Sequence, residues 1–216
     1  MPALFPRWTN TAVRATLIAA LCALVGVPAA LMGWVRSPNA TRRYAPVAQP
    51  VAFDHRVHVA GLGIDCRYCH FSVERSAAAG IPPSTTCVPC HDQRLLNSAT
   101  LAPVRLSADA GRPLEWNRVH RLPDFVYFDH AIHVAKGVGC ETCHGRVDRM
   151  AAVYQAAPLT MGWCVSCHRD PAPNLRPTSA ITAMGWRAPA AQPAYGKQLQ
   201  TEYHVRELTT CTSCHR

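Results

Sequence analysis

The chain has 216 residues and a formal net charge of +9, from 22 lysines and arginines against 13 aspartates and glutamates. It also contains 18 prolines and 12 glycines, which interrupt regular structure and argue against long helices or an extended sheet. A basic chain is electrostatically drawn to phosphate, so charge alone would allow a nucleic-acid-binding protein. Eleven cysteines and eleven histidines point to a different chemistry.

The first predicted element is a membrane-spanning helix over residues 15–35. No charged residue occurs between Arg14 and Arg36, and a helix of this length would span about 31 Å, against a hydrocarbon core of about 30 Å. Pro28 lies inside the segment, and proline is tolerated in membrane helices where neighbouring groups satisfy the backbone.

A cleavable export signal is the alternative interpretation of the same segment. Arg7 and Arg14 precede the apolar run, and small residues stand at Ala29 and Ala30, as they do before a signal cleavage site. The apolar length favours a retained anchor. Residues 36–50 contain three prolines and predict an extended tether between this helix and the rest of the chain.

Residues 51–216 contain five copies of the pattern C-x-x-C-H, which use ten of the eleven cysteines. This pattern is the attachment sequence of c-type haem, in which two thiols bond to the porphyrin vinyl groups and the adjacent histidine binds the iron. Five motifs predict five covalently bound haem c groups. The motifs are Cys66, Cys69 and His70; Cys87, Cys90 and His91; Cys140, Cys143 and His144; Cys164, Cys167 and His168; and Cys211, Cys214 and His215.

Structural zinc and disulfide bonds are the alternatives for so many cysteines. Zinc ligation does not require a histidine directly after the second cysteine, yet one follows in every copy. Cysteines separated by two residues within a tight turn make strained disulfides. Both alternatives therefore fit the pattern less well than haem attachment.

The haem domain is internally duplicated. The segment F-D-H-x-x-H-V-A precedes the first motif at residue 53 and the third motif at residue 128, and V-[E/D]-R-x-A-A follows each of these motifs. A repeat with an offset near 75 residues indicates two dihaem modules, at 51–111 and 112–176, with a fifth haem in 177–216. Because five macrocycles must fill the interior, we expect a multihaem cytochrome c fold of coil and short α-helices with little β-structure.

Each iron needs a sixth ligand, and the histidines outside the motifs are the natural candidates. We predict His55, His58, His120, His130 and His133 as these ligands, which leaves His204, among charged residues, as the spare. His55 and His58 are three residues apart, as are His130 and His133, so on a helix each pair shares one face. Two imidazoles placed so closely can bind two different irons. Met161 and Met184 are further candidates.

Haem changes the expected charge and location of the protein. Ten propionates and five irons bring the net charge to about +4 when oxidised and about −1 when reduced, so we expect no nucleic-acid binding. Haem c is attached outside the cytoplasmic membrane. Residues 1–14 are therefore predicted to be cytoplasmic, and the haem domain is predicted to be periplasmic or extracytoplasmic.

The block at residues 115–177, from "EWNRVHRLPDF" to "CVSCHRDPAPNLRP", resembles the pentahaem cytochrome subunit of alternative complex III, and the resemblance covers most of residues 50–216. More distantly, F-D-H-x-x-H before C-x-x-C-H is similar to class III multihaem cytochromes. The resemblance implies an electron-transfer subunit that is not itself an enzyme. The partners it implies are an iron–sulfur subunit like molybdopterin oxidoreductases, polytopic quinol-binding subunits and a monohaem cytochrome c.

Two other functions remain open at this point. A stand-alone, membrane-anchored quinol dehydrogenase of the tetrahaem type would dock directly onto a reductase. A multihaem nitrite or hydroxylamine reductase would need one iron with an open position, although the chain offers more candidate ligands than irons. We therefore predict no catalytic residue in this chain.

Overall fold

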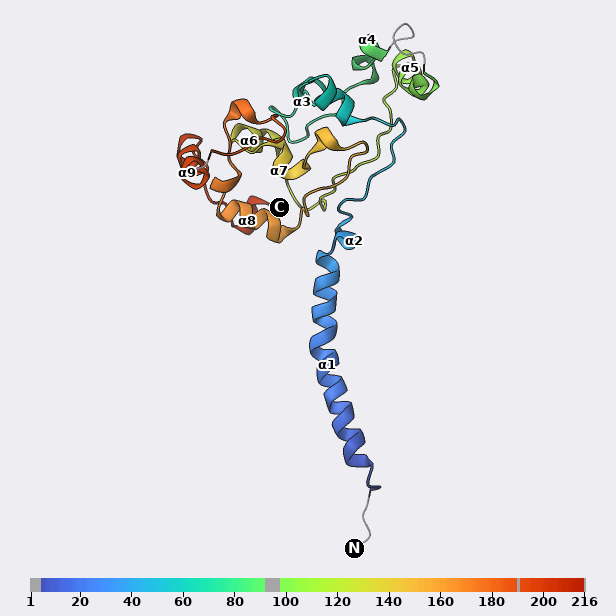
Figure 1. Ribbon diagram of the computed structural model, residues 1–216, viewed down its shortest axis with the longest axis vertical. Coiled ribbons are helices and arrows are strands. Elements are labelled where there is room, and N and C mark those ends of the chain that lie inside the picture. The colour runs from blue at the N-terminus through green and yellow to red at the C-terminus, as the bar shows by residue number, and fades with distance from the viewer. Residues whose placement is uncertain (1–4, 92–97, 190, 216) are drawn as a thin grey trace. The chain divides into compact units, whose positions relative to one another are not determined.

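The computed structural model describes residues 5–91, 98–189 and 191–215 (Figure 1). The chain divides into two compact units, and the boundary lies between Arg43 and Tyr44. The first unit contains the apolar segment, and the second contains all five C-x-x-C-H motifs.

Most of the first unit is α1 (Thr9–Arg36; Figure 1). This helix has 28 residues, and none of its side chains is buried. The helix includes the whole predicted apolar segment and begins before it, with Pro28 in its interior. Its most apolar window has a mean hydropathy of 2.3, so it is long and apolar enough to cross a membrane, a test that an N-terminal signal sequence also passes. Ser37 has extended backbone and caps the following turn, α2 (Pro38–Thr41).

The second unit consists of short helices joined by loops, without a β-strand among its described residues. This confirms the predicted fold class of coil and short helices. The helices are η1 (Arg56–Gly61), α3 (Cys66–Cys69), η2 (Ser84–Thr86), α4 (Val88–His91), η3 (Ala99–Leu101), α5 (Ala102–Asp109), α6 (His130–Ala135), α7 (Cys140–His144), η4 (Val147–Arg149), α8 (Met161–Arg169), η5 (Ala172–Asn174), η6 (Thr178–Ala180), α9 (Gln192–Glu202) and η7 (Cys211–Ser213).

The apolar side chains of the second unit form only a small core among themselves. Leu175 is 1% exposed and is the one large side chain under 2% exposure in the described part of the chain. Many other apolar side chains are more than half exposed, among them Leu62, Phe71, Ile81, Phe125 and Ile132. Exposure on this scale is unusual for a folded domain. It agrees with the expectation that large cofactors make up much of the interior.

The predicted tether does not run free over its full length. The N–H of Tyr44 donates to the carbonyl of Gln155 at 3.0 Å, and the N–H of Val47 donates to the carbonyl of Val153 at 3.3 Å. The part of the tether after Arg43 therefore packs within the second unit.

The two copies of the repeat differ in how their first helix begins. In the second copy the Asp129 carboxylate accepts the N–H of Ile132 and caps α6, which is a regular α-helix. In the first copy the equivalent Asp54 instead pairs with the Arg56 guanidinium at 2.7 Å, and η1 is a π-helix. Alanine stands at the position of Arg56 in the second copy, so there the carboxylate is free to cap the helix.

Near the C-terminus, α9 packs on η5 through Gly196. A Cβ at this position would lie 2.1 Å from the carbonyl oxygen of Ala172, so a larger residue would force the two elements apart.

We predict that Gly196→Ala lowers the free energy of unfolding by about 1–3 kcal/mol, the usual effect of overpacking. Urea denaturation followed by circular dichroism measures this change. Lys197→Ala in the same helix is the control, because its side chain is 61% exposed and such substitutions usually change stability by less than about 0.5 kcal/mol. Equal effects of the two substitutions would contradict the packing role of Gly196.

Candidate haem-binding sites

Each C-x-x-C-H motif forms a single helical turn in the second unit. We number the motifs in chain order: site 1 in α3, site 2 in α4, site 3 in α7, site 4 in α8 and site 5 in η7. In site 1 the N–H of His70 donates to the carbonyl of Cys66 at 2.8 Å, and the equivalent bond closes site 2 at 3.0 Å and site 5 at 2.9 Å. Positions i, i+3 and i+4 share one face of a helix, so the turn presents two thiols and an imidazole together.

Five imidazoles are oriented by a hydrogen bond from Nδ1 to a backbone carbonyl. A carbonyl only accepts, so Nδ1 carries the proton and Nε2 keeps a free lone pair. This is the arrangement that metal-bound histidines commonly have. The bonds run from His58 to Asp54 at 2.9 Å, from His70 to Gly80 at 2.7 Å, from His130 to Ala77 at 2.7 Å, from His133 to Asp129 at 2.7 Å and from His215 to Phe125 at 3.2 Å.

Three motif histidines each face an imidazole from an F-D-H-x-x-H segment. The ring centroids are 5.9 Å apart for His58 and His91, 6.3 Å for His130 and His144, and 6.0 Å for His133 and His168. Two metal–nitrogen bonds of about 2 Å, with a ring radius of about 1 Å at each end, give a separation of about 6 Å. The three pairs therefore have the spacing that one iron between two imidazoles requires.

The phenylalanine of each F-D-H-x-x-H segment holds its two histidines apart. Phe128 stacks on His133 with centroids 4.5 Å apart and meets His130 edge to face at 4.7 Å. Phe53 makes the same two contacts, at 4.3 Å and 4.7 Å, with the histidines of the first copy. The phenylalanine recurs with the histidines in both copies of the repeat, and this recurrence is the sequence signal for its role.

His55 occupies in the first copy the place that His130 has in the second. Burial lowers the pKa of His55 to about 4, with further contributions from the nearby His70 and His58 imidazoles. Its Nδ1 atom is buried without a hydrogen-bond partner. His55 thus lies close to the motif histidine of site 1, as the predicted ligand role requires.

His120, predicted as a ligand without a particular site, lies beside site 3. Its ring meets that of His144 edge to face with centroids 4.3 Å apart, which is too close for the two to bind opposite sides of one iron. Its Nε2 atom is buried and unpaired. Burial, with the neighbouring His120 and His130 imidazoles, lowers the pKa of His144 to about 3. His144 is therefore neutral at pH 7, as an iron ligand must be.

Site 5 differs from the others in its surroundings. The ring contact found for His215 among the described residues is with Phe125, at 5.7 Å. His204, the predicted spare, is exposed and has a positive φ of 51°. Met161 is 67% exposed, and Met184 is half-buried.

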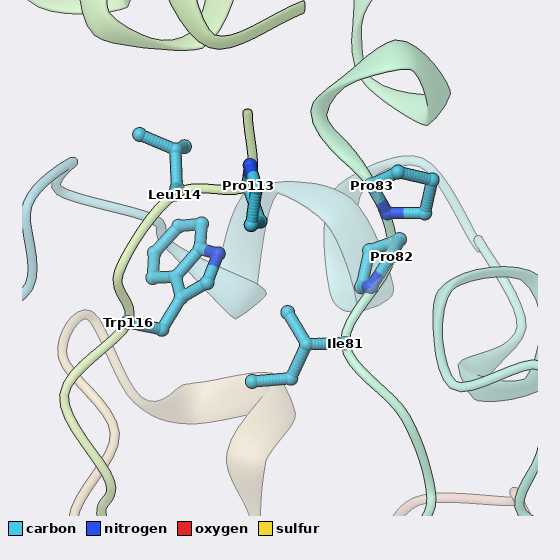
Figure 2. A pocket seen from close by; sticks show the side chains of 6 residues that line it. All are labelled: Ile81, Pro82, Pro83, Pro113, Leu114 and Trp116. Atoms are coloured by element: carbon cyan, nitrogen blue, oxygen red, sulfur yellow. The ribbon is translucent and has the colours of Figure 1, made fainter. Parts of the chain in front are cut away.

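An apolar groove of about 380 Å³ adjoins site 2. Figure 2 shows Ile81 and two prolines on one segment facing Leu114 and Trp116 on another. The Ile81 segment leads into α4, and Trp116 contacts Phe53 edge to face at 6.4 Å. The groove therefore offers an apolar wall of the kind that a porphyrin needs.

A buried ion pair supports site 3. Arg176, 7% exposed, reaches Glu141 within the motif at 2.9 Å, and its guanidinium lies over the Trp186 ring. A Cβ on Gly139 would lie 2.2 Å from the guanidinium carbon, so glycine is needed there. Arg176 could not be identified from the sequence, because nothing near residue 176 in the chain indicates its partner.

Comparison with known proteins agrees with this geometry. Residues 132–216 match the family model described as cytochrome c3. Residues 132–216, which contain sites 3, 4 and 5, are therefore similar to cytochrome c3. Covalent haem c is the cofactor of this kind of domain, and the cysteines, oriented imidazoles and apolar walls described above fit it.

A similar protein is the multihaem cytochrome c subunit of menaquinone reductase from Nitratidesulfovibrio vulgaris. It is 35% identical over 124 residues, which make up 56% of this chain and 56% of that protein. The chain thus spans little more than half the length of this relative.

We predict that His130→Ala leaves all five haems attached, because the motif cysteines are unchanged, but removes one of the low-spin ferric signals in the electron paramagnetic resonance spectrum. A high-spin signal or an altered low-spin signal should replace it, the latter if the unpaired Nε2 of His120 takes the position.

His204→Ala is the matched control and should leave every haem signal unchanged. Loss of a low-spin signal in this variant would assign His204 to site 5 and disprove its role as the spare.

Proposed function

We propose that this protein is a membrane-anchored pentahaem cytochrome c that relays electrons within a quinone-linked membrane complex of the alternative complex III type. The observation that carries the proposal is the set of three imidazole pairs, each about 6 Å apart, at motifs that supply two thiols. Such a site would hold its iron between two imidazoles and would leave no position for a substrate.

Cysteines and histidines would have different roles in binding the five haems. The ten motif cysteines would tether the macrocycles, and the five motif histidines would bind the irons from one side. His55, His58, His130 and His133 would bind from the other side at sites 1 to 4. His120, the fifth ligand predicted from the sequence, lies beside site 3, where His130 already faces His144. Haem c, when bound, supplies a reversible one-electron couple.

Backbone carbonyls keep the imidazoles in place during electron transfer. Each Nδ1–H donated to a carbonyl fixes the ring orientation and raises the basicity of Nε2. The Phe53 and Phe128 rings pack between paired histidines and limit their rotation. Rigid ligation supports fast electron transfer, since little rearrangement accompanies a change of iron charge.

Similarity supports a quinone-linked partner set. The alternative complex III resemblance implies an iron–sulfur subunit, polytopic quinol-binding subunits and a monohaem cytochrome c. The relative from Nitratidesulfovibrio is named as a subunit of a menaquinone reductase. Both similarities associate such a cytochrome with quinone chemistry in a larger complex, but they differ in the direction of electron flow. We infer flow from quinol toward an extracytoplasmic acceptor.

The proposed location follows from the cofactor and from α1. Haem c is attached outside the cytoplasmic membrane, so the second unit would lie on that side, with α1 as a single-pass anchor.

A reductase function would have to use site 5. His215 contacts Phe125 there, whereas three other motif histidines face an imidazole. A high-spin ferric signal in the intact protein that changes on addition of nitrite or hydroxylamine would support this alternative.

The experiment that tests the proposal is purification of the tagged protein in mild detergent, with identification of every co-purifying subunit. We expect an iron–sulfur subunit and polytopic subunits, and reduction of the haems on addition of menaquinol. Mass spectrometry of the chain should show five covalently added tetrapyrroles.

A protein that purifies alone yet is reduced by menaquinol would instead be the stand-alone quinol dehydrogenase. Fewer than five attached tetrapyrroles would contradict the proposal that this chain is a pentahaem electron relay.

A further inference from the structure

Sites 1 and 3 touch although 74 residues separate their first cysteines. Cys140 lies near enough to Cys66 for its thiol to be the largest cause of the raised pKa of the Cys66 thiol. Each of these sulfur atoms would be bonded to a porphyrin substituent in the loaded protein. The closeness of the two cysteines therefore makes the two macrocycles neighbours.

One segment, residues 175–185, holds both of these motifs, and we call it the clasp. The hydroxyl of Thr182 donates to the Asp65 carboxylate, directly before Cys66, at 2.8 Å. The N–H of Cys140 donates to the carbonyl of Ile181 at 3.0 Å. Consecutive residues of the clasp thus bind the beginning of site 1 and the beginning of site 3.

The clasp is itself fixed to site 3 by charge. Arg176 pairs with Glu141, and the N–H of Gly185 donates to the second oxygen of the same carboxylate at 2.6 Å. Both Arg176 and Glu141 are buried, with 7% and 14% of their side chains exposed. Separating a buried pair leaves an uncompensated charge, so the clasp is not easily displaced.

The second copy of the repeat also contacts the first copy beside site 1. The Nδ1–H and the backbone N–H of His130 both donate to the carbonyl of Ala77, and the N–H of Ala131 donates to Ser76. The helix that faces site 3 therefore rests on the segment that follows site 1.

The other pairs of neighbouring sites are linked by the helices and loops that carry their ligands. His130 and His133 lie on one helix and face sites 3 and 4, and His55 and His58 lie one turn apart close to sites 1 and 2. Site 5 lies next to site 4. Burial raises the pKa of the Cys164 thiol, and Cys214 is near enough to raise it further. The carbonyl of Cys214 also accepts a hydrogen bond from the N–H of Tyr127, just before α6.

We propose that the five attachment sites form a single file in the spatial order 2–1–3–4–5, in which sites 1 and 3 are the junction between the duplicated modules and the clasp holds that junction together. This inference rests on the proposed function. It makes sites 2 and 5 the ends of the file, where electrons are exchanged with partners, whereas the order along the chain would make site 1 an end.

Two attachment-site variants of the full-length protein distinguish the orders. Cys87→Ala with Cys90→Ala removes site 2, and Cys66→Ala with Cys69→Ala removes site 1. A redox titration followed by electron paramagnetic resonance then counts the remaining haems whose midpoint potential has shifted. We expect one shifted haem after loss of site 2 and two after loss of site 1. Two shifts for site 2 and one for site 1 would overturn the proposed order.

Thr182→Val provides a test that retains every haem. It removes the hydroxyl bonded to Asp65, and we expect five attached haems with changed signals for two of them. Thr201→Val is the control, because the Thr201 hydroxyl donates to the carbonyl of Lys197 within α9. An unchanged spectrum for Thr182→Val would overturn the junction.

The mass of the protein without substitutions, measured with its attached haems, distinguishes a failure of the proposed function from a failure of the proposed order. Fewer than five tetrapyrroles would contradict the proposed function, whatever the order. Five tetrapyrroles with the reversed pattern of shifts would contradict only the single file.

Discussion

The structure depends on a simple property of histidine: an imidazole that binds a metal through Nε2 carries its proton on Nδ1, and this N–H usually donates to an acceptor that fixes the ring. Here the Nδ1–H groups of five imidazoles donate to backbone carbonyls. The path of the main chain is therefore tied to the positions of the ligands. Because the acceptors lie in loops and helix ends, the loops are as constrained as the helices, which explains how a domain with so small a side-chain core can still be ordered.

The same property explains the use of the F-D-H-x-x-H segment. The carbonyl of Asp54 or Asp129 orients the second histidine of each pair, and the phenylalanine separates it from the first. The first histidine of the second copy has its acceptor, Ala77, in the other module. One short segment thus orients a ligand locally and also binds the two modules together.

Duplication preserved these ligand geometries while other details changed. Asp129 caps a regular helix, whereas Asp54 pairs with Arg56 beside a π-helix, yet the second histidine faces a motif histidine at nearly the same distance in both copies. The buried pair of Arg176 and Glu141 belongs to the second copy. The modules therefore share the way they hold an imidazole and differ in the contacts that join them to the rest of the chain.

The sequence by itself determined the motifs, the duplication, the apolar helix and the absence of extended sheet, because these are properties of local spacing and composition. It also identified the paired histidines, since residues three apart on a helix share a face. Which imidazole faces which motif was decided only by the tertiary structure, as was the position of His120 beside site 3. Contacts such as Cys66 with Cys140, or Thr182 with Asp65, join residues far apart in the chain. Carbonyl acceptors and contacts of this kind depend on where the backbone runs in space, and no side-chain pattern records that path.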